Sequence, residues 1–132
     1  MHLNPFAISN LFIIVTLLPF SFFLSIKGKT PVAKLYFYCS CCTLIWGTGA
    51  FIATTTPNQN MASLFLRIAY CGVIFIPVFV EHSIHFLLNK KSKLFLLFAY
   101  LQAFYFLYLT LASKLFEIKL FFNSFYYFKG TP

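Results

Sequence analysis

Three side chains that can bind protons or metal ions lie between positions 81 and 85, in an otherwise apolar part of the chain: Glu81, His82 and His85. Glu81 and His85 are four residues apart, and His82 and His85 are three apart, so an α-helix would carry all three on one side. Such a cluster could sense protons, because imidazole changes charge near neutral pH, or contribute ligands to zinc. Proton sensing is favoured over metal binding for that reason. The default interpretation is a polar patch that reaches the membrane interface or packs against further helices.

An arginine lies in the same apolar run, which extends from Ala62 to Leu88. Ionisable groups inside a membrane are costly and usually face other helices or water. The guanidinium of Arg67 could extend roughly 9 Å along its helix to reach the interface. The alternative is an ion pair with Glu117, the other carboxylate of the chain. We therefore place the candidate site in this third run.

The composition indicates a membrane protein and excludes several enzyme classes. Only 9% of the residues are charged and 61% are hydrophobic, whereas soluble domains carry about 25% charged residues. Two acidic residues and no glycine-rich phosphate loop leave no machinery for phosphoryl transfer, so we expect no enzymatic activity and no cofactor. The net charge of +8 comes from lysines at the ends of apolar runs, where membrane proteins need them, and we predict no nucleic-acid binding.

Four apolar runs are long enough to cross a bilayer as helices. The predicted fold is all-α, with spans at about residues 6–26, 35–54, 62–88 and 94–112. Residues 113–132 alternate charged with aromatic side chains, which is typical of a segment in the membrane interface. The first and third connections carry three lysines each and the second carries none. By the positive-inside rule the N-terminus is outside and both lysine loops are cytoplasmic.

The second run contains small and polar residues at helical spacing: Cys39, Thr43, Gly47 and Ala50. Such a stripe lets neighbouring helices approach closely in lipid. The same run holds a C-x-x-C spacing, Cys39 to Cys42. Redox motifs of this type need an accessible helix start, so we interpret these cysteines as packing residues.

One family pattern is visible in the second and third runs: Trp46, Arg67, Tyr70, Gly72 and Pro77. Together with the aromatic–glycine segment at 126–130, this pattern resembles the N-terminal seven-transmembrane sensor region of bacterial sensor histidine kinases. The resemblance extends over residues 1–132 and implies a multi-pass input domain in the bacterial cytoplasmic membrane. The chain stops where that family's fifth helix should start, so we expect part of such a domain. Further transmembrane helices or a second copy of the chain are then the expected partners, besides lipid.

Two other functions fit the same features. The chain could be a small four-helix scaffold, or a transporter subunit that forms its pathway around Glu81 by dimerising. Glu81, His82 and His85 match no motif of the sensor family.

Overall fold

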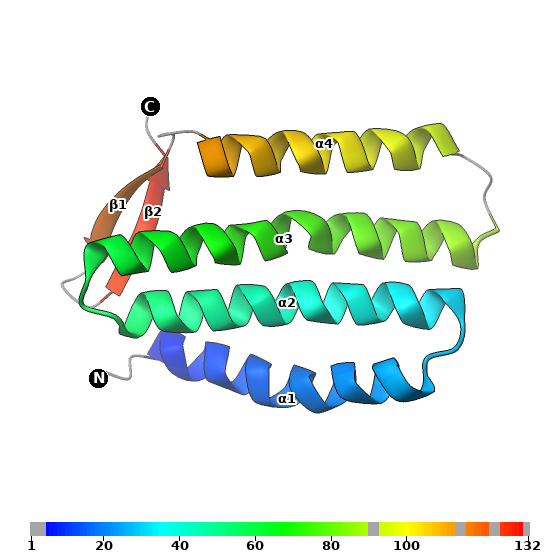
Figure 1. Cartoon of the computed structure of the whole chain (residues 1–132), viewed down its shortest axis with the longest axis horizontal. Helices are drawn as coiled ribbons and strands as arrows, with labels where there is room; N and C mark the ends of the chain where they lie inside the picture. The colour runs from blue at the N-terminus through cyan, green and yellow to red at the C-terminus, as the bar shows by residue number, and fades with distance from the viewer. Residues whose placement is uncertain (1–4, 90–92, 113–115, 122–124, 131–132) are drawn as a thin grey trace.

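The computed structural model describes residues 5–89, 93–112, 116–121 and 125–130. Four α-helices lie side by side in chain order, each antiparallel to the one before it (Figure 1). They are α1 (Pro5–Lys27), α2 (Pro31–Thr55), α3 (Gln59–Leu87) and α4 (Lys93–Ala112). Each is long and apolar enough to span a membrane. The prediction of four helices that are long and apolar enough to cross a membrane is confirmed, and it supports a multi-pass membrane protein.

Side chains in the short connections fix where the second and third helices begin. The Thr30 hydroxyl accepts a hydrogen bond from the amide of Ala33 at 3.2 Å, and Pro31 follows as the first residue of α2. Asn58 caps α3, its Oδ1 accepting from the amide of Asn60 at 2.9 Å. These residues satisfy amides that a helix start leaves without partners. The cap at Asn58 starts α3 three residues before the apolar run begins.

Glycine brings α2 and α3 into backbone contact. A Cβ atom at Gly49 would lie 2.7 Å from the carbonyl oxygen of Phe65, and one at Gly72 would overlap the carbonyl oxygen of Cys42. Only glycine allows this approach. Gly47 serves the other side of α2, because a Cβ there would meet Ile14 of α1 at an ordinary 3.5 Å.

Within the predicted small-residue stripe, Gly47 lies against α1. Gly47 and Ala50 are buried, while Cys39 and Thr43 are half-buried. The closest approach to α3 uses α2 positions outside the stripe, Gly49 and Cys42, the second of which lies against Gly72 of α3.

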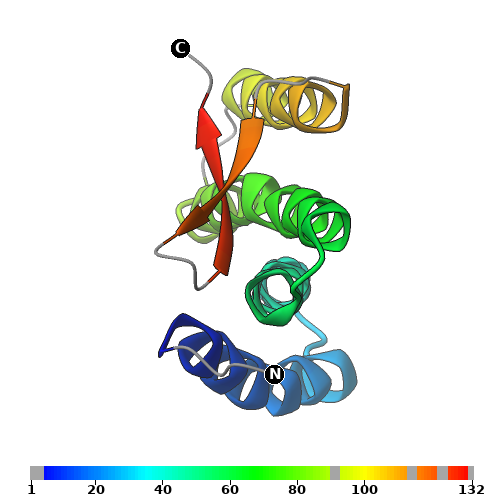
Figure 2. The same cartoon turned by 90° about the vertical axis from the view of Figure 1, so that its left-hand side faces the viewer.

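The fourth helix packs only along one side. Figure 2 shows α4 beyond α3 and apart from α1 and α2. Its outward side chains are among the most exposed apolar residues, with Leu94 at 80% and Phe98 at 69%. Such a surface must be covered by lipid or by other helices.

The end of the chain forms a β-hairpin that the sequence analysis did not anticipate. Strands β1 (Phe116–Phe121) and β2 (Phe125–Gly130) pair antiparallel, with Phe116 opposite Gly130 and Phe121 opposite Phe125. The strand β2 lies against α2 and α3 at the end where these two helices connect (Figures 1 and 2). Alternation of apolar and charged residues from 116 to 120 has the period of two that strands require, and the expectation of an interfacial segment overlooked this signal.

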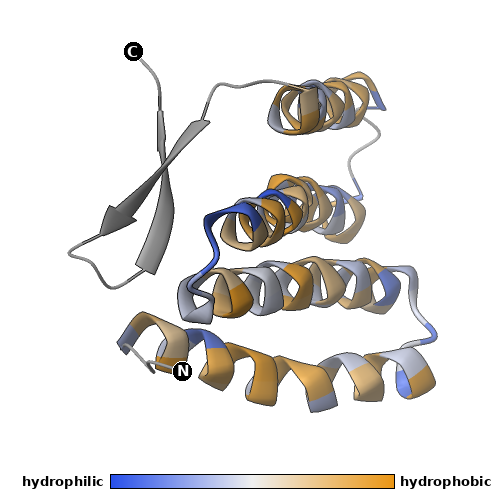
Figure 3. Cartoon of the chain, turned by 60° about the vertical axis from the view of Figure 1, so that its left-hand side comes forward, coloured by the Kyte–Doolittle hydropathy of each residue, from blue (hydrophilic) through white to orange (hydrophobic). Residues whose placement is uncertain are grey.

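The lysines that the structure describes in the first and third connections lie at one end of the bundle. Lys27, Lys29, Lys34 and Lys93 are exposed where α1 meets α2 and where α4 begins. The opposite end carries the uncharged polar turn between α2 and α3, seen as hydrophilic ribbon in Figure 3. The two lysine-bearing connections thus share one end, which the positive-inside argument requires.

Candidate functional site

A carboxylate and an imidazole pair within the last turns of α3. His85 Nδ1 lies 3.1 Å from Glu81 Oε1 and also 3.1 Å from the Glu81 carbonyl oxygen. The His85 side chain is only 11% exposed, whereas that of Glu81 is 37% exposed. The imidazole also stacks on the ring of Phe95 from α4, with centroids 5.3 Å apart and 14° between the planes. The helical spacing predicted that the two side chains share one side of the helix, but it did not predict the aromatic partner on α4.

The second histidine turns to a different partner. His82 Nδ1 lies 2.9 Å from the Tyr100 hydroxyl, and the two rings meet edge to face at 5.9 Å. This hydrogen bond connects α3 to α4, and Tyr100 had not been considered as a partner. Among the residues that the structure describes, no three histidine, cysteine or acidic side chains converge where one metal ion could sit.

A cavity of about 410 Å³ lies between α3 and α4, next to the Glu81–His85 pair. Residues of α3 form one wall: Val73, Ile74, Pro77, Val78 and Glu81. Residues of α4 form the other wall: Phe95, Ala99, Gln102, Ala103 and Phe106. The volume lies within the range of about 300–1,000 Å³ that small-molecule sites occupy.

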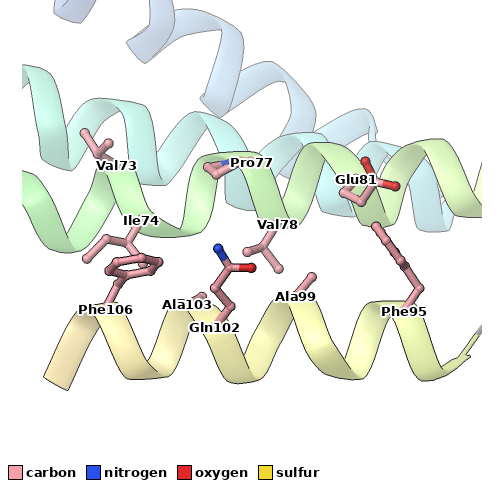
Figure 4. Close-up of a pocket in the computed structure, with 10 residues that line it drawn as sticks. All are labelled: Val73, Ile74, Pro77, Val78, Glu81, Phe95, Ala99, Gln102, Ala103 and Phe106. Carbon is pink, nitrogen blue, oxygen red and sulfur yellow. The ribbon is translucent and has the colours of Figure 1, made fainter. Parts of the chain in front are cut away.

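The side chains of α4 explain why this space stays open (Figure 4). Ala99 and Ala103 are four residues apart and present only methyl groups toward α3. Phe95 and Phe106 are large, and they bracket the small residues at either end of the cavity. The bulky residues keep the helices apart, so the alanines between them leave a void. Glu81 and Gln102 supply the polar groups of an otherwise apolar lining.

A second cavity, of about 360 Å³, lies nearer the lysine-bearing end of the bundle. Its lining includes His82, His85 and Asn89. Because Glu81 lines the first cavity and His85 the second, their pair lies between the two spaces. A change in the pair would alter both cavities.

Arg67 reaches α4 near the opposite end of α3. Its Nη1 donates a hydrogen bond to the carbonyl oxygen of Leu111 at 3.2 Å. Leu111 lies in the last turn of α4, where carbonyls lack helical partners and a positive charge is favourable. Arg67 therefore caps α4. The side chain of Glu117, its predicted alternative partner, lies outside the described residues.

The residues of the family pattern serve two different sides of α3. Gly72 packs against the backbone of Cys42 and Trp46 on α2. Arg67 and Pro77 face α4, the first through its hydrogen bond and the second through the cavity. Tyr70 is 36% exposed. The pattern thus marks α3 as the helix that contacts both neighbours.

Comparisons of the chain with protein-family models, with curated proteins and with solved structures found no match.

Proposed function

We propose that this chain is the membrane-embedded input region of a signal-transduction protein, of the seven-transmembrane sensor type found on bacterial histidine kinases. The observation that carries the proposal is the α3–α4 interface. A titratable pair, Glu81 and His85, stands there beside a ligand-sized cavity, and few contacts hold the two helices together. Input domains need an element whose position a stimulus can bias. Here that element is α4.

The stimulus acts at the Glu81–His85 pair. Protonation of the imidazole strengthens its attraction to the carboxylate and alters its stacking on Phe95. The neighbouring bond between His82 and Tyr100 transmits the change to α4. At the other end of α3, the bond from Arg67 couples the last turn of α4 to the same helix.

The proposed orientation places the N-terminus outside and the lysine-rich end in the cytoplasm of a bacterium. The clustering of Lys27, Lys29, Lys34 and Lys93 at one end supports it, because short loops rich in lysine stay cytoplasmic. The input site then lies in the cytoplasmic half of the membrane. We expect a cysteine placed at position 58 to be labelled from outside the cell. A cysteine placed at position 29 should not be labelled from that side.

The gene and a signalling assay test the proposal. The reading frame that contains this chain should encode further spans and a kinase or cyclase domain. In that full-length protein, Glu81→Gln and His85→Ala should each shift the output curve measured between acidic and neutral pH. Tyr108→Phe, at a position 67% exposed on α4, is the matched control. A stop codon after position 132, or unchanged curves in both variants with normal membrane insertion, would contradict the proposal.

A transporter subunit is the second candidate, and the two cavities that meet at the Glu81–His85 pair favour it. A carboxylate between two spaces is a common feature of proton-coupled pathways. Proteoliposomes that hold the chain separate the two functions. A proton flux that Glu81→Gln abolishes would favour the transporter.

A further inference from the structure

The wall of the α3–α4 cavity carries one charged group, the carboxylate of Glu81. Glu81 is also the only acidic residue in the part of the chain whose side chains the structure describes. An anionic ligand would be repelled there, and a purely apolar ligand would make no use of the carboxylate, which would keep His85 as its partner. The chemical complement of this cavity is a cation attached to an apolar body.

The surroundings of His85 show which groups meet a nitrogen atom at this position. Its imidazole lies 3.1 Å from the Glu81 carboxylate and stacks on the face of Phe95. Carboxylate and aromatic ring together form the arrangement that binds ammonium groups, through charge and through cation–π attraction. Phe95 also lines the cavity, so a ligand entering there meets the same two groups.

From this geometry we propose that the α3–α4 cavity binds a protonated hydrophobic amine. The ammonium group pairs with Glu81 and displaces His85 from the carboxylate. The apolar body lies along the methyl groups of Ala99 and Ala103, as far as Phe106. Gln102 offers an amide oxygen to a second N–H of the ligand. The inference names the ligand of the input site proposed above, and it rests on that function only for its physiological meaning.

A lipid chain or a second copy of this chain are the competing occupants of the groove. A lipid chain would fill the apolar part and leave Glu81 unused. A second copy packed through the large exposed apolar side chains of α1 and α4 would likewise leave the carboxylate paired with His85. Charge complementarity therefore selects the amine.

Binding of phenylbutylamine to the full chain in phosphatidylcholine nanodiscs tests the proposal. Phenylbutanol and phenylbutyrate have the same apolar body, with a neutral and an anionic group. The amine should bind about tenfold more tightly than the alcohol, the ratio expected for a charge-assisted hydrogen bond, and the anion should not bind. Equal affinity for amine and alcohol would overturn the proposal in favour of a groove for lipid chains.

Four variants locate the site. Glu81→Gln should weaken amine binding about tenfold while leaving alcohol binding unchanged. His85→Ala should strengthen amine binding, because the competing imidazole is gone. Ala99→Leu fills the cavity and should abolish binding of both probes. Leu97→Phe, on the side of α4 that lines a different surface, is the control and should bind like the original chain.

Helicity and a single size-exclusion peak confirm that each variant is folded. Amine affinity unchanged by both Glu81→Gln and Ala99→Leu would place binding elsewhere and overturn the proposal. The signalling assay tests the proposed input function separately from ligand binding. Amine binding without any effect on output would contradict the input function and leave the binding site intact. Output that depends on Glu81 without amine binding would contradict only the ligand assignment.

Discussion

The two sides of α3 meet their neighbours in opposite ways. Toward α2, glycines at 49 and 72 allow the backbones to touch, and no side chain could be added there. Toward α4, aromatic rings hold the helices apart, and the space between them contains a charged pair and a cavity. Close packing without polar groups leaves a pair of helices one arrangement. A polar interface with free volume allows two arrangements of the helices. An element that responds to a stimulus needs two such arrangements.

Gly72→Leu should have the largest effect on stability, because it places a bulky side chain in the close interface between α2 and α3. The new side chain would overlap the carbonyl of Cys42, and backbone cannot yield as a flexible side chain does. We expect a loss of about 3 kcal/mol in the free energy of unfolding, at the upper end for overpacked sites. Unfolding by denaturing detergent, followed by circular dichroism, measures it.

Gly47→Ala is the matched control on α2. A methyl group there meets Ile14 at 3.5 Å, which is an ordinary contact. Alanine favours helix over glycine by up to about 1 kcal/mol. The variant should be as stable as the original chain or more so. An equal loss of stability in Gly72→Leu and Gly47→Ala would mean that the two sides of α2 pack equally closely.

Arg67→Met should weaken the α4 side by about 2 kcal/mol, since it removes a hydrogen bond from a charged donor but keeps an unbranched apolar stem. The loss should appear at the end of α4 and leave α1–α3 intact. Hydrogen exchange of the amides in α4, compared with those in α2, measures it. Uniformly faster exchange in all four helices would show that the α3–α4 contact is not separable.

The sequence was sufficient for the parts of the fold that depend on composition and on local spacing. Apolar runs of sufficient length predicted the four helices, and the interval between Glu81 and His85 predicted that they share one side of α3. Contacts between helices were harder to predict from the sequence. Nothing local indicates that Tyr100 lies opposite His82, because that contact depends on the register between α3 and α4.

The cavity and the hairpin were missed for different reasons. The cavity results from two alanines placed between two phenylalanines on α4, and it exists only once α3 lies opposite. The hairpin had a local signal, the alternation of apolar and charged residues from 116 to 120. The high aromatic content of these residues favoured a segment that lies in the membrane interface.

Tyr100→Phe should weaken the contact between α3 and α4 by about 0.6 kcal/mol, the average for a hydrogen bond between membrane helices. The phenylalanine ring keeps the edge-to-face contact with His82, so only the bond of the hydroxyl is lost. Detergent unfolding of the variant, beside Tyr108→Phe as a control at an exposed position, measures the difference. Identical unfolding curves for the two variants would show that the Tyr100 hydroxyl does not stabilise the contact between α3 and α4.

Ala99→Val should produce the smallest change, and its sign tests the comparison of the two interfaces most directly. Two added methyl groups enter the cavity, where free volume is available. Filled cavities gain dispersion contacts, but a β-branched residue costs a few tenths of a kcal/mol in a helix. The net effect should lie between zero and about 1 kcal/mol of stabilisation. The same substitution at Ala53 of α2, which is fully buried, has no such space and should destabilise by about 1–3 kcal/mol. Opposite signs at the two alanines would establish that α3 has one closed side and one adaptable side. A loss of stability at both would mean that α4 packs as tightly as α2 and cannot serve as the moving element.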